Sequence, residues 1–177
     1  LTNSLGQRTV YRHAIVGGQQ RLLEVRGAGC ASCGATNVRY AYDKLGQLLE
    51  TTRLDDNGEP VSASWRELDQ LGRTVRAGSV AYQHGKRGAA QWRLRLEYTG
   101  DDPAPTLIAR PSVVPGKERQ TRIEYNAMGQ VLRVTQTGWM PSYDGMQAAA
   151  AIARTTSYQY AIIAGHSLLT RIDGPLP

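Results

Sequence analysis

The chain has 177 residues, and its 21 lysine and arginine residues against 15 aspartate and glutamate residues give a net charge of +6 at pH 7. Hydrophobic residues make up 41% and charged residues 20%, which is ordinary globular usage and excludes wholesale disorder. The longest apolar run, residues 148–153, is far shorter than the roughly 20 residues of a transmembrane helix, so we expect no membrane span. The arginines are scattered among acidic residues and form no basic run, which indicates solvated strand faces and argues against nucleic acid as a partner.

The sequence begins at Leu1, not at methionine, and ends in Gly174-Pro-Leu-Pro177. We therefore expect a piece of a longer protein that forms one repeat region over 1–177. Phenylalanine is absent, whereas tyrosine occurs 9 times and glycine 19 times. Aromatic side chains with a polar tip suit half-exposed sheet faces, which favours β structure.

Four segments along the chain share one pattern: Asp or Asn, two residues, Gly, then Gln or Arg. In chain order they are Asn3 with Gly6, Asp43 with Gly46, Asp69 with Gly72 and Asn126 with Gly129. Asp or Asn at the first position of a type I turn accepts hydrogen bonds from backbone amides, and Gly at the fourth position adopts the left-handed conformation. A turn of this kind connects the two strands of a β-hairpin. Each copy therefore predicts one hairpin.

The segments between these turns alternate as strands do. The clearest runs from Trp92 to Tyr98, where apolar and charged residues alternate, and weaker strands are expected at 79–83, 106–110, 131–136 and 167–172. A degraded copy of the pattern lies at Tyr158–Gly165. The alanine-rich stretch 145–154 predicts one short helix inserted between strands. The expected fold is an all-β, antiparallel assembly of hairpins with this single helix.

The second copy resembles a known repeat. Tyr40-Ala-Tyr42-Asp43-Lys-Leu-Gly46-Gln-Leu48 is similar to the YD repeat of bacterial Rhs proteins, whose pattern is Tyr-x-Tyr-Asp-x-x-Gly-Arg-Leu. The copy at Tyr125-Asn126 resembles it with Asn in place of Asp, the copy at Asp69 departs from it at both tyrosines, and the opening segment at Asn3 looks like the tail of a fourth copy.

The resemblance implies a structural role. In Rhs proteins such hairpins wind into a hollow shell that encloses a C-terminal toxin, and the proteins are secreted or lie at the cell surface. The implied partners are the rest of the shell and that toxin or effector. The repeats are not catalytic there, so these residues carry over as hairpin-forming positions: Asn3, Gly6, Tyr40, Tyr42, Asp43, Gly46, Asp69, Gly72, Tyr125, Asn126 and Gly129.

Cys30 and Cys33 form a Cys-x-x-Cys motif between glycines. The pair can form a disulfide or stay as free thiols, can supply two ligands to zinc, or can take part in redox exchange. Zinc needs two further ligands, and His13, His84 and His166 lie at no metal-binding spacing to one another. Apart from an incomplete zinc site at the two cysteines, no cofactor is expected.

The main alternative function is a carbohydrate- or cell-surface-binding β module, because exposed aromatic rings stack on sugars. Its candidate residues are Trp92, Tyr98, Trp139 and Tyr143. No Gly-x-Ser-x-Gly, His-Glu-x-x-His or phosphate-loop motif occurs, so an enzyme is not expected. The acidic segments at Asp55–Gly58 and Asp101-Asp102 lack calcium-loop spacing and are expected to be turns. Unpaired edge strands invite pairing with another chain, so we also expect the isolated chain to self-associate.

Overall fold

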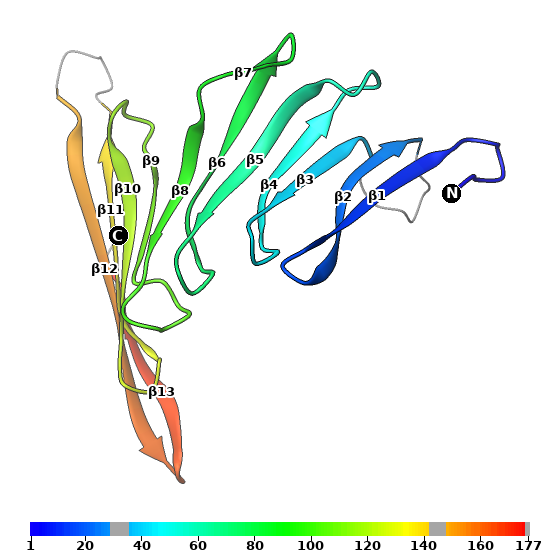
Figure 1. The fold of residues 1–177 in the computed structure, drawn as a ribbon. Helices are drawn as coiled ribbons and strands as arrows, with labels where there is room; N and C mark the ends of the chain where they lie inside the picture. Colours follow the sequence, from blue (N-terminus) through cyan, green and yellow to red (C-terminus); the bar gives the residue numbers. More distant parts are fainter. Residues whose placement is uncertain (29–35, 142–147, 176–177) are drawn as a thin grey trace. The chain divides into compact units, whose positions relative to one another are not determined.

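The computed structural model describes residues 1–28, 36–141 and 148–175. Across these residues the chain is all β, with thirteen antiparallel strands in one sheet and no helix (Figure 1). Strands that follow one another in the sequence are neighbours in the sheet, except that the short β7 pairs only with β6, so that β8 follows β6. The strands are β1 (Thr9–Val16), β2 (Gln19–Gly27), β3 (Val38–Tyr42), β4 (Leu48–Leu54), β5 (Pro60–Leu68), β6 (Thr74–Gln83), β7 (Lys86–Arg87), β8 (Gln91–Glu97), β9 (Leu107–Pro111), β10 (Glu118–Tyr125), β11 (Val131–Met140), β12 (Ala150–Ile163) and β13 (His166–Asp173). The predicted all-β hairpin fold is confirmed.

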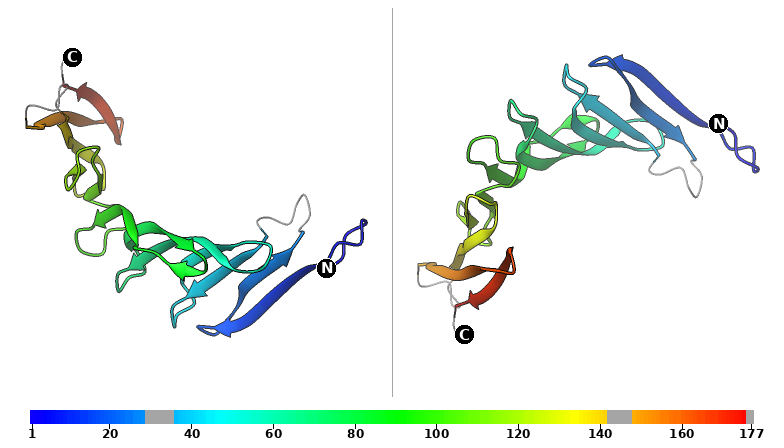
Figure 2. Two further views of the ribbon diagram at one scale, coloured as in Figure 1. Left: turned by 90° about the horizontal axis from the view of Figure 1, so that it is seen from above. Right: turned by 90° about the horizontal axis from the view of Figure 1, so that it is seen from below.

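The chain divides into two compact units, Leu1–Arg93 and Leu94–Pro177. Within each unit, hairpins lie edge to edge, and Figure 2 shows their ribbons in one layer. Both units contain the repeat turns, Asp43 and Asp69 in the first and Asn126 in the second. That the whole of 1–177 forms one repeat region stays a prediction.

The buried apolar side chains of this sheet are mostly small. In the first unit Val25 of β2 pairs directly with Val38 of β3, and both are almost fully buried. Ala109 at the centre of β9 is fully buried. Larger apolar side chains, such as Ile162 and Ile172 of the β12–β13 hairpin, stay 66% and 59% exposed. In a single layer of sheet, small side chains are buried by residues on the adjacent strands, whereas many larger apolar side chains stay exposed to solvent.

A β-bulge follows several of the turns. In the hairpin of β3 and β4, Ala41 pairs with Glu50 but Tyr42 pairs with Leu48, so Leu49 is the extra residue on the second strand. The pairing shifts by one residue at the same place in β5–β6 and β10–β11, where Val75 and Leu132 are the extra residues. Bulges increase the local twist and fix the register of the paired strands. The repeat therefore determines the twist and register of each hairpin as well as its turn.

The predicted helix at 145–154 is wrong wherever the structure describes it. Residues 145–147 lie outside the described residues, and residues 150–154 open the strand β12. Each of these pairs with β11, from Met140 opposite Ala150 to Gln136 opposite Arg154. The advantage of alanine in a helix is a few tenths of a kcal/mol per residue. A ladder of hydrogen bonds to a preformed neighbouring strand outweighs that advantage.

Candidate functional site

Each predicted repeat turn closes around the side chain of its Asp or Asn. At Asp43, Oδ1 accepts hydrogen bonds from the backbone N–H groups of Leu45 and Gln47 at 2.9 and 2.8 Å. The Asp43 carbonyl accepts one from the N–H of Gly46 at 3.1 Å, and Gly46 has a φ of 79°. The same three contacts recur in the turns that begin at Asn3, Asp69 and Asn126. The four segments thus form one recurring turn, with the glycine in the left-handed region.

A further turn of this form joins β4 to β5, where the sequence predicts a turn but not a copy of the repeat. Asp55 Oδ1 accepts the backbone N–H of Glu59 at 2.8 Å, the Asp55 carbonyl accepts that of Gly58 at 3.0 Å, and Gly58 has a φ of 89°. The spacing Asp-x-x-Gly is intact here, but no tyrosine precedes it. The missed signal was the spacing itself, which lies midway between the turns at Asp43 and Asp69.

In the two copies that have a tyrosine before the Asp or Asn, this tyrosine joins one hairpin to the previous one. The hydroxyl of Tyr42 on β3 donates to the carbonyl of Leu22 on β2 at 2.8 Å. The hydroxyl of Tyr125 on β10 donates to the carbonyl of Pro105, just before β9, at 3.2 Å. Both bonds cross from one hairpin to its neighbour in the same unit, so the tyrosine is a link between hairpins.

The degraded copy at the end of the chain keeps this link without the turn. Tyr160 on β12 donates to the carbonyl of Val131 on β11 at 3.0 Å. The Asp-x-x-Gly turn is replaced by a two-residue turn at Ala164-Gly165, both with positive φ. The link and the turn are therefore separable parts of the repeat.

The copy that lacks both tyrosines makes the link with arginine. Leu68 precedes Asp69 and carries no donor, but Nε of Arg66 donates to the carbonyl of Leu48 on β4. Leu48 lies two residues after the repeat glycine Gly46, just as Val131 lies two residues after Gly129. Arg66 thus reaches the acceptor that a tyrosine uses elsewhere. Sequence analysis missed this role because the donor sits two residues from the expected position.

In two copies the glutamine after the repeat glycine also reaches the next hairpin. The side chain of Gln47 packs so closely on Gly72 that a Cβ there would lie 2.6 Å from Gln47 Oε1. In the second unit, Gln130 Nε2 and the Ser167 hydroxyl are 3.0 Å apart. Adjacent turns at one end of the strands are therefore in contact.

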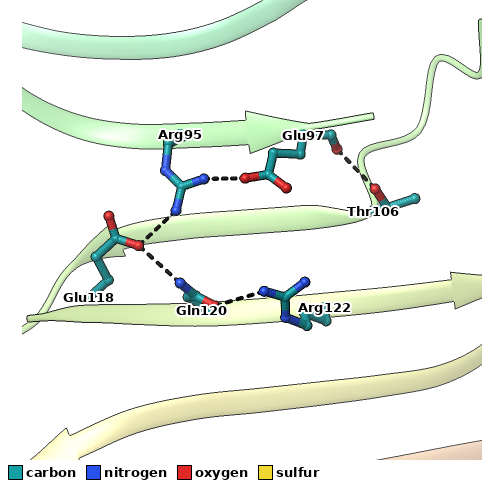
Figure 3. A network of polar contacts seen from close by, with 6 residues as sticks. All are labelled: Arg95, Glu97, Thr106, Glu118, Gln120 and Arg122. Carbon is teal, nitrogen blue, oxygen red and sulfur yellow. Dashed lines mark hydrogen bonds and ion pairs between the residues drawn. The ribbon is translucent and has the colours of Figure 1, made fainter. Parts of the chain in front are cut away.

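A polar network covers one face of the second unit, from β8 across β9 to β10 (Figure 3). Arg95 on β8 forms an ion pair with Glu118 on β10 at 2.8 Å and another with Glu97. It crosses over Ala109, which lies opposite Arg95 on one side and Gln120 on the other. A small residue on the middle strand leaves the room for this bridge.

The carboxylates of such networks are held in their charged form. Hydrogen bonds from Gln120 and Arg95 lower the pKa of Glu118. In the first unit a hydrogen bond from Arg87 lowers the pKa of Glu50, against the opposing effect of burial. A carboxylate with a lowered pKa is a poor general base at neutral pH, so this chemistry fits cross-strand bridging rather than proton transfer.

The aromatic residues predicted to stack on sugars are only partly accessible. Trp92, Tyr98 and Trp139 are half-buried, and Tyr143 lies outside the described residues. The ammonium of Lys117 lies 4.3 Å from the centroid of the Trp139 ring, so one face of that ring holds a cation–π contact. Trp92 belongs to the first unit, whereas Tyr98 and Trp139 belong to the second. Sugar stacking stays a prediction.

The Cys-x-x-Cys motif, Cys30 and Cys33, lies outside the described residues. Elsewhere in the described chain, no group of three or more His, Cys, Asp or Glu side chains is placed to hold a metal ion. A zinc site at the two cysteines therefore stays a prediction.

Comparison with models of protein families found no match. A search of curated proteins found no relative either. The described residues contain no helix that is long and apolar enough to cross a membrane.

Proposed function

We propose that this chain is a segment of a repeat-built β wall, of the kind that encloses a polypeptide cargo in Rhs-type proteins, and that the segment itself catalyses no reaction. The observation that carries the proposal is the recurring link between hairpins. Tyr42, Tyr125 and Tyr160 each bind a backbone carbonyl of the preceding hairpin, and Arg66 does the same where tyrosine is missing. A chain in which four hairpins each donate a side-chain hydrogen bond to the hairpin before them is suited to extension by further hairpins.

The exposed apolar surface supports the same function. The β12–β13 hairpin exposes Ile162, Leu168, Leu169 and Ile172 by about half or more. Exposed apolar side chains grouped on one element mark a surface that is covered in the working assembly. In a wall, the neighbouring hairpins or the enclosed cargo cover such a surface.

The test is made on the native polypeptide in its source cells. An antibody raised against residues 36–141 is expected to detect a polypeptide far larger than 19.4 kDa, the mass of this chain. Digestion of the captured native material with a non-specific protease is expected to spare an enclosed polypeptide, which becomes sensitive after mild denaturation. A native polypeptide of about 19.4 kDa would overturn the wall proposal, since so short a wall encloses nothing. A large polypeptide without any protected cargo would overturn the enclosing role.

A further inference from the structure

One face of the second unit has a hollow in which every charged side chain is an arginine. The hollow has a volume of about 460 Å³ and contains Arg110, Arg119 and Arg154. Among the described residues that line it there is no aspartate or glutamate. It lies on the face opposite to the Arg95–Glu118 network, because Arg119 and Glu118 are consecutive on β10 and point to opposite sides.

The strand pairing brings the three arginines together. Arg110 on β9 pairs directly with Arg119 on β10, and Arg154 on β12 pairs with Gln136 on β11. Adjacent strands are about 4.8 Å apart, so the three side chains start within a few strand spacings of one another. They surround the segment of β11 that contains Gln136 and Gly138.

Gly138 keeps the floor of the hollow open. It pairs with Ile152 on β12, and a Cβ added at Gly138 would lie 3.7 Å from Ile152 Cγ1 and 3.9 Å from Arg119 Cβ. Any larger side chain there would extend into the space between the arginines. Glycine inside a strand lowers the stability of the sheet, and in this position it leaves the floor of the hollow open.

The charge in the hollow is not balanced by the described chain. Like charges directly opposite each other on paired strands are destabilising, and Arg110 and Arg119 are such a pair. None of the three arginines has an ion pair or a hydrogen bond with another described residue, whereas Arg95 on the opposite face pairs with Glu118 and Glu97. Three exposed guanidinium groups are thus left with their donors directed to solvent or to a ligand.

We propose that this hollow binds a small organic ligand through a phosphate or sulfate ester group. Guanidinium groups match these oxyanions in a bidentate manner, and a tetrahedral group offers enough oxygens for several arginines, whereas a carboxylate offers two. Ile108 on β9 and Ile152 on β12 line two sides of the hollow and offer apolar contacts to the organic part. The volume lies within the usual range of small-molecule sites. This proposal does not depend on the wall function.

The test is calorimetric titration of the whole chain with phenyl phosphate and with phenyl sulfate, two probes that share one organic group and differ in the ester. Saturable one-site binding of either probe is expected, and the tighter probe identifies the ester. Because a hydrogen bond to a charged group contributes about 1.5–3 kcal/mol, Arg119→Gln should weaken binding by about ten- to a hundredfold.

Two further variants make the result specific. Arg122→Gln removes the same charge from the opposite face of the same strand and should change the affinity by less than about twofold. Gly138→Val keeps the charge, fills the floor and should weaken binding by about tenfold or more, while circular dichroism confirms that the sheet is intact. Failure of both probes to saturate the wild-type chain would overturn the proposal. Equal weakening by Arg119→Gln and Arg122→Gln would do so as well, since it would reveal only the net charge.

Discussion

The hairpins that turn at Asp43 and at Asp69 have the same turn but contact the preceding hairpin differently. We call this contact between neighbouring hairpins the joint. Both aspartates accept the same pair of backbone N–H groups, and the following glycines, Gly46 and Gly72, have φ values of 79° and 78°. The local sequence therefore sets the turn in both copies, whatever lies beside it.

The joints differ in how rigid their contacts are. The turn at Asp43 meets the backbone of the preceding turn, where a Cβ on Gly17 would lie 2.3 Å from the carbonyl carbon of Leu45. The turn at Asp69 meets the flexible side chain of Gln47 instead. The first joint leaves no room for a side chain at Gly17, because backbone atoms face it. The second joint can adjust, because the side chain of Gln47 can change its rotamer. A repeat wall thus keeps its turn constant and varies its joints.

The largest expected effect comes from the rigid joint. Gly17→Ala places a methyl group against the backbone of Leu45 and adds a left-handed alanine at φ 59°. We expect a loss of about 3 kcal/mol in the free energy of unfolding, measured by urea titration. Gly18→Ala is the matched control in the same turn, because its φ is 74° but no atom lies within 4 Å of the added Cβ. It should cost only about 1–2 kcal/mol. Equal costs would show that the two turns are not in contact.

The tyrosine link gives the next largest effect. Tyr42→Phe removes the hydrogen bond to the carbonyl of Leu22 and leaves the ring in place, so we expect a loss of about 1 kcal/mol. Tyr40→Phe is the control, since the Tyr40 hydroxyl has no hydrogen bond with the described residues, and should change the stability by less than about 0.3 kcal/mol. If both variants lost the same free energy, the hydroxyl of Tyr42 would not link the hairpins.

The turns could be predicted from the sequence because all their contacts lie within five residues. The aspartate, the glycine and the amides that they bind are read directly from the spacing. The acceptor of Tyr42 could not be predicted, because Leu22 is 20 residues away and the bond depends on how β3 pairs with β2. For the same reason, the sequence did not predict that Arg66 takes the role of the missing tyrosine.

Residues outside the repeat were harder to interpret. The alanine run predicted a helix because its local propensity is high, and pairing of β12 with β11 overrode that propensity. The arginine hollow could not be seen in the sequence, because Arg110, Arg119 and Arg154 are separated along the chain. Only the register of four strands brings them to one place on one face.

The stability of the turn at Asp69 is expected to depend on pH. Burial opposes ionisation there, but hydrogen bonds from the Arg73 side chain and from the backbone of Arg73 and Leu71 lower the pKa of Asp69 below its ordinary value of 3.8. Because the pKa of Asp69 is lower in the folded state than in the unfolded state, its carboxylate stabilises the fold when the pH is above the unfolded-state pKa. This stabilisation is lost as the pH falls through the folded-state pKa.

Asp69→Asn keeps an oxygen that can accept both backbone amides, as Asn126 does in its own turn, and removes only the charge. We expect the variant to be less stable than the wild type at about pH 6, by less than the loss from Tyr42→Phe, and the difference to vanish well below pH 3.8. Urea unfolding at several pH values measures it. A difference that stays constant across this range would exclude the ion pair with Arg73 as its cause.

The smallest effect tests whether arginine and tyrosine are interchangeable in the joint. Arg66 is exposed, so Arg66→Ala should cost only about 0.5 kcal/mol. On β5, the register set by the pair Glu50–Trp65 puts Leu68 one residue past the position opposite Leu48. On β12, the register set by the pair Arg133–Ser157 puts Tyr160 one residue past the position opposite Val131. Leu68 therefore occupies the position from which a tyrosine reaches the carbonyl.

Adding Leu68→Tyr to Arg66→Ala should restore the lost stability, because the new hydroxyl can take the acceptor that Arg66 has vacated. Leu68→Tyr alone should gain less, since the Leu48 carbonyl is then already occupied by Arg66. A double-mutant cycle of the four proteins measures this difference as a coupling free energy. Strict additivity would mean that the two side chains do not compete for one acceptor, and the arginine would then be an unrelated surface contact rather than a substitute for the missing tyrosine.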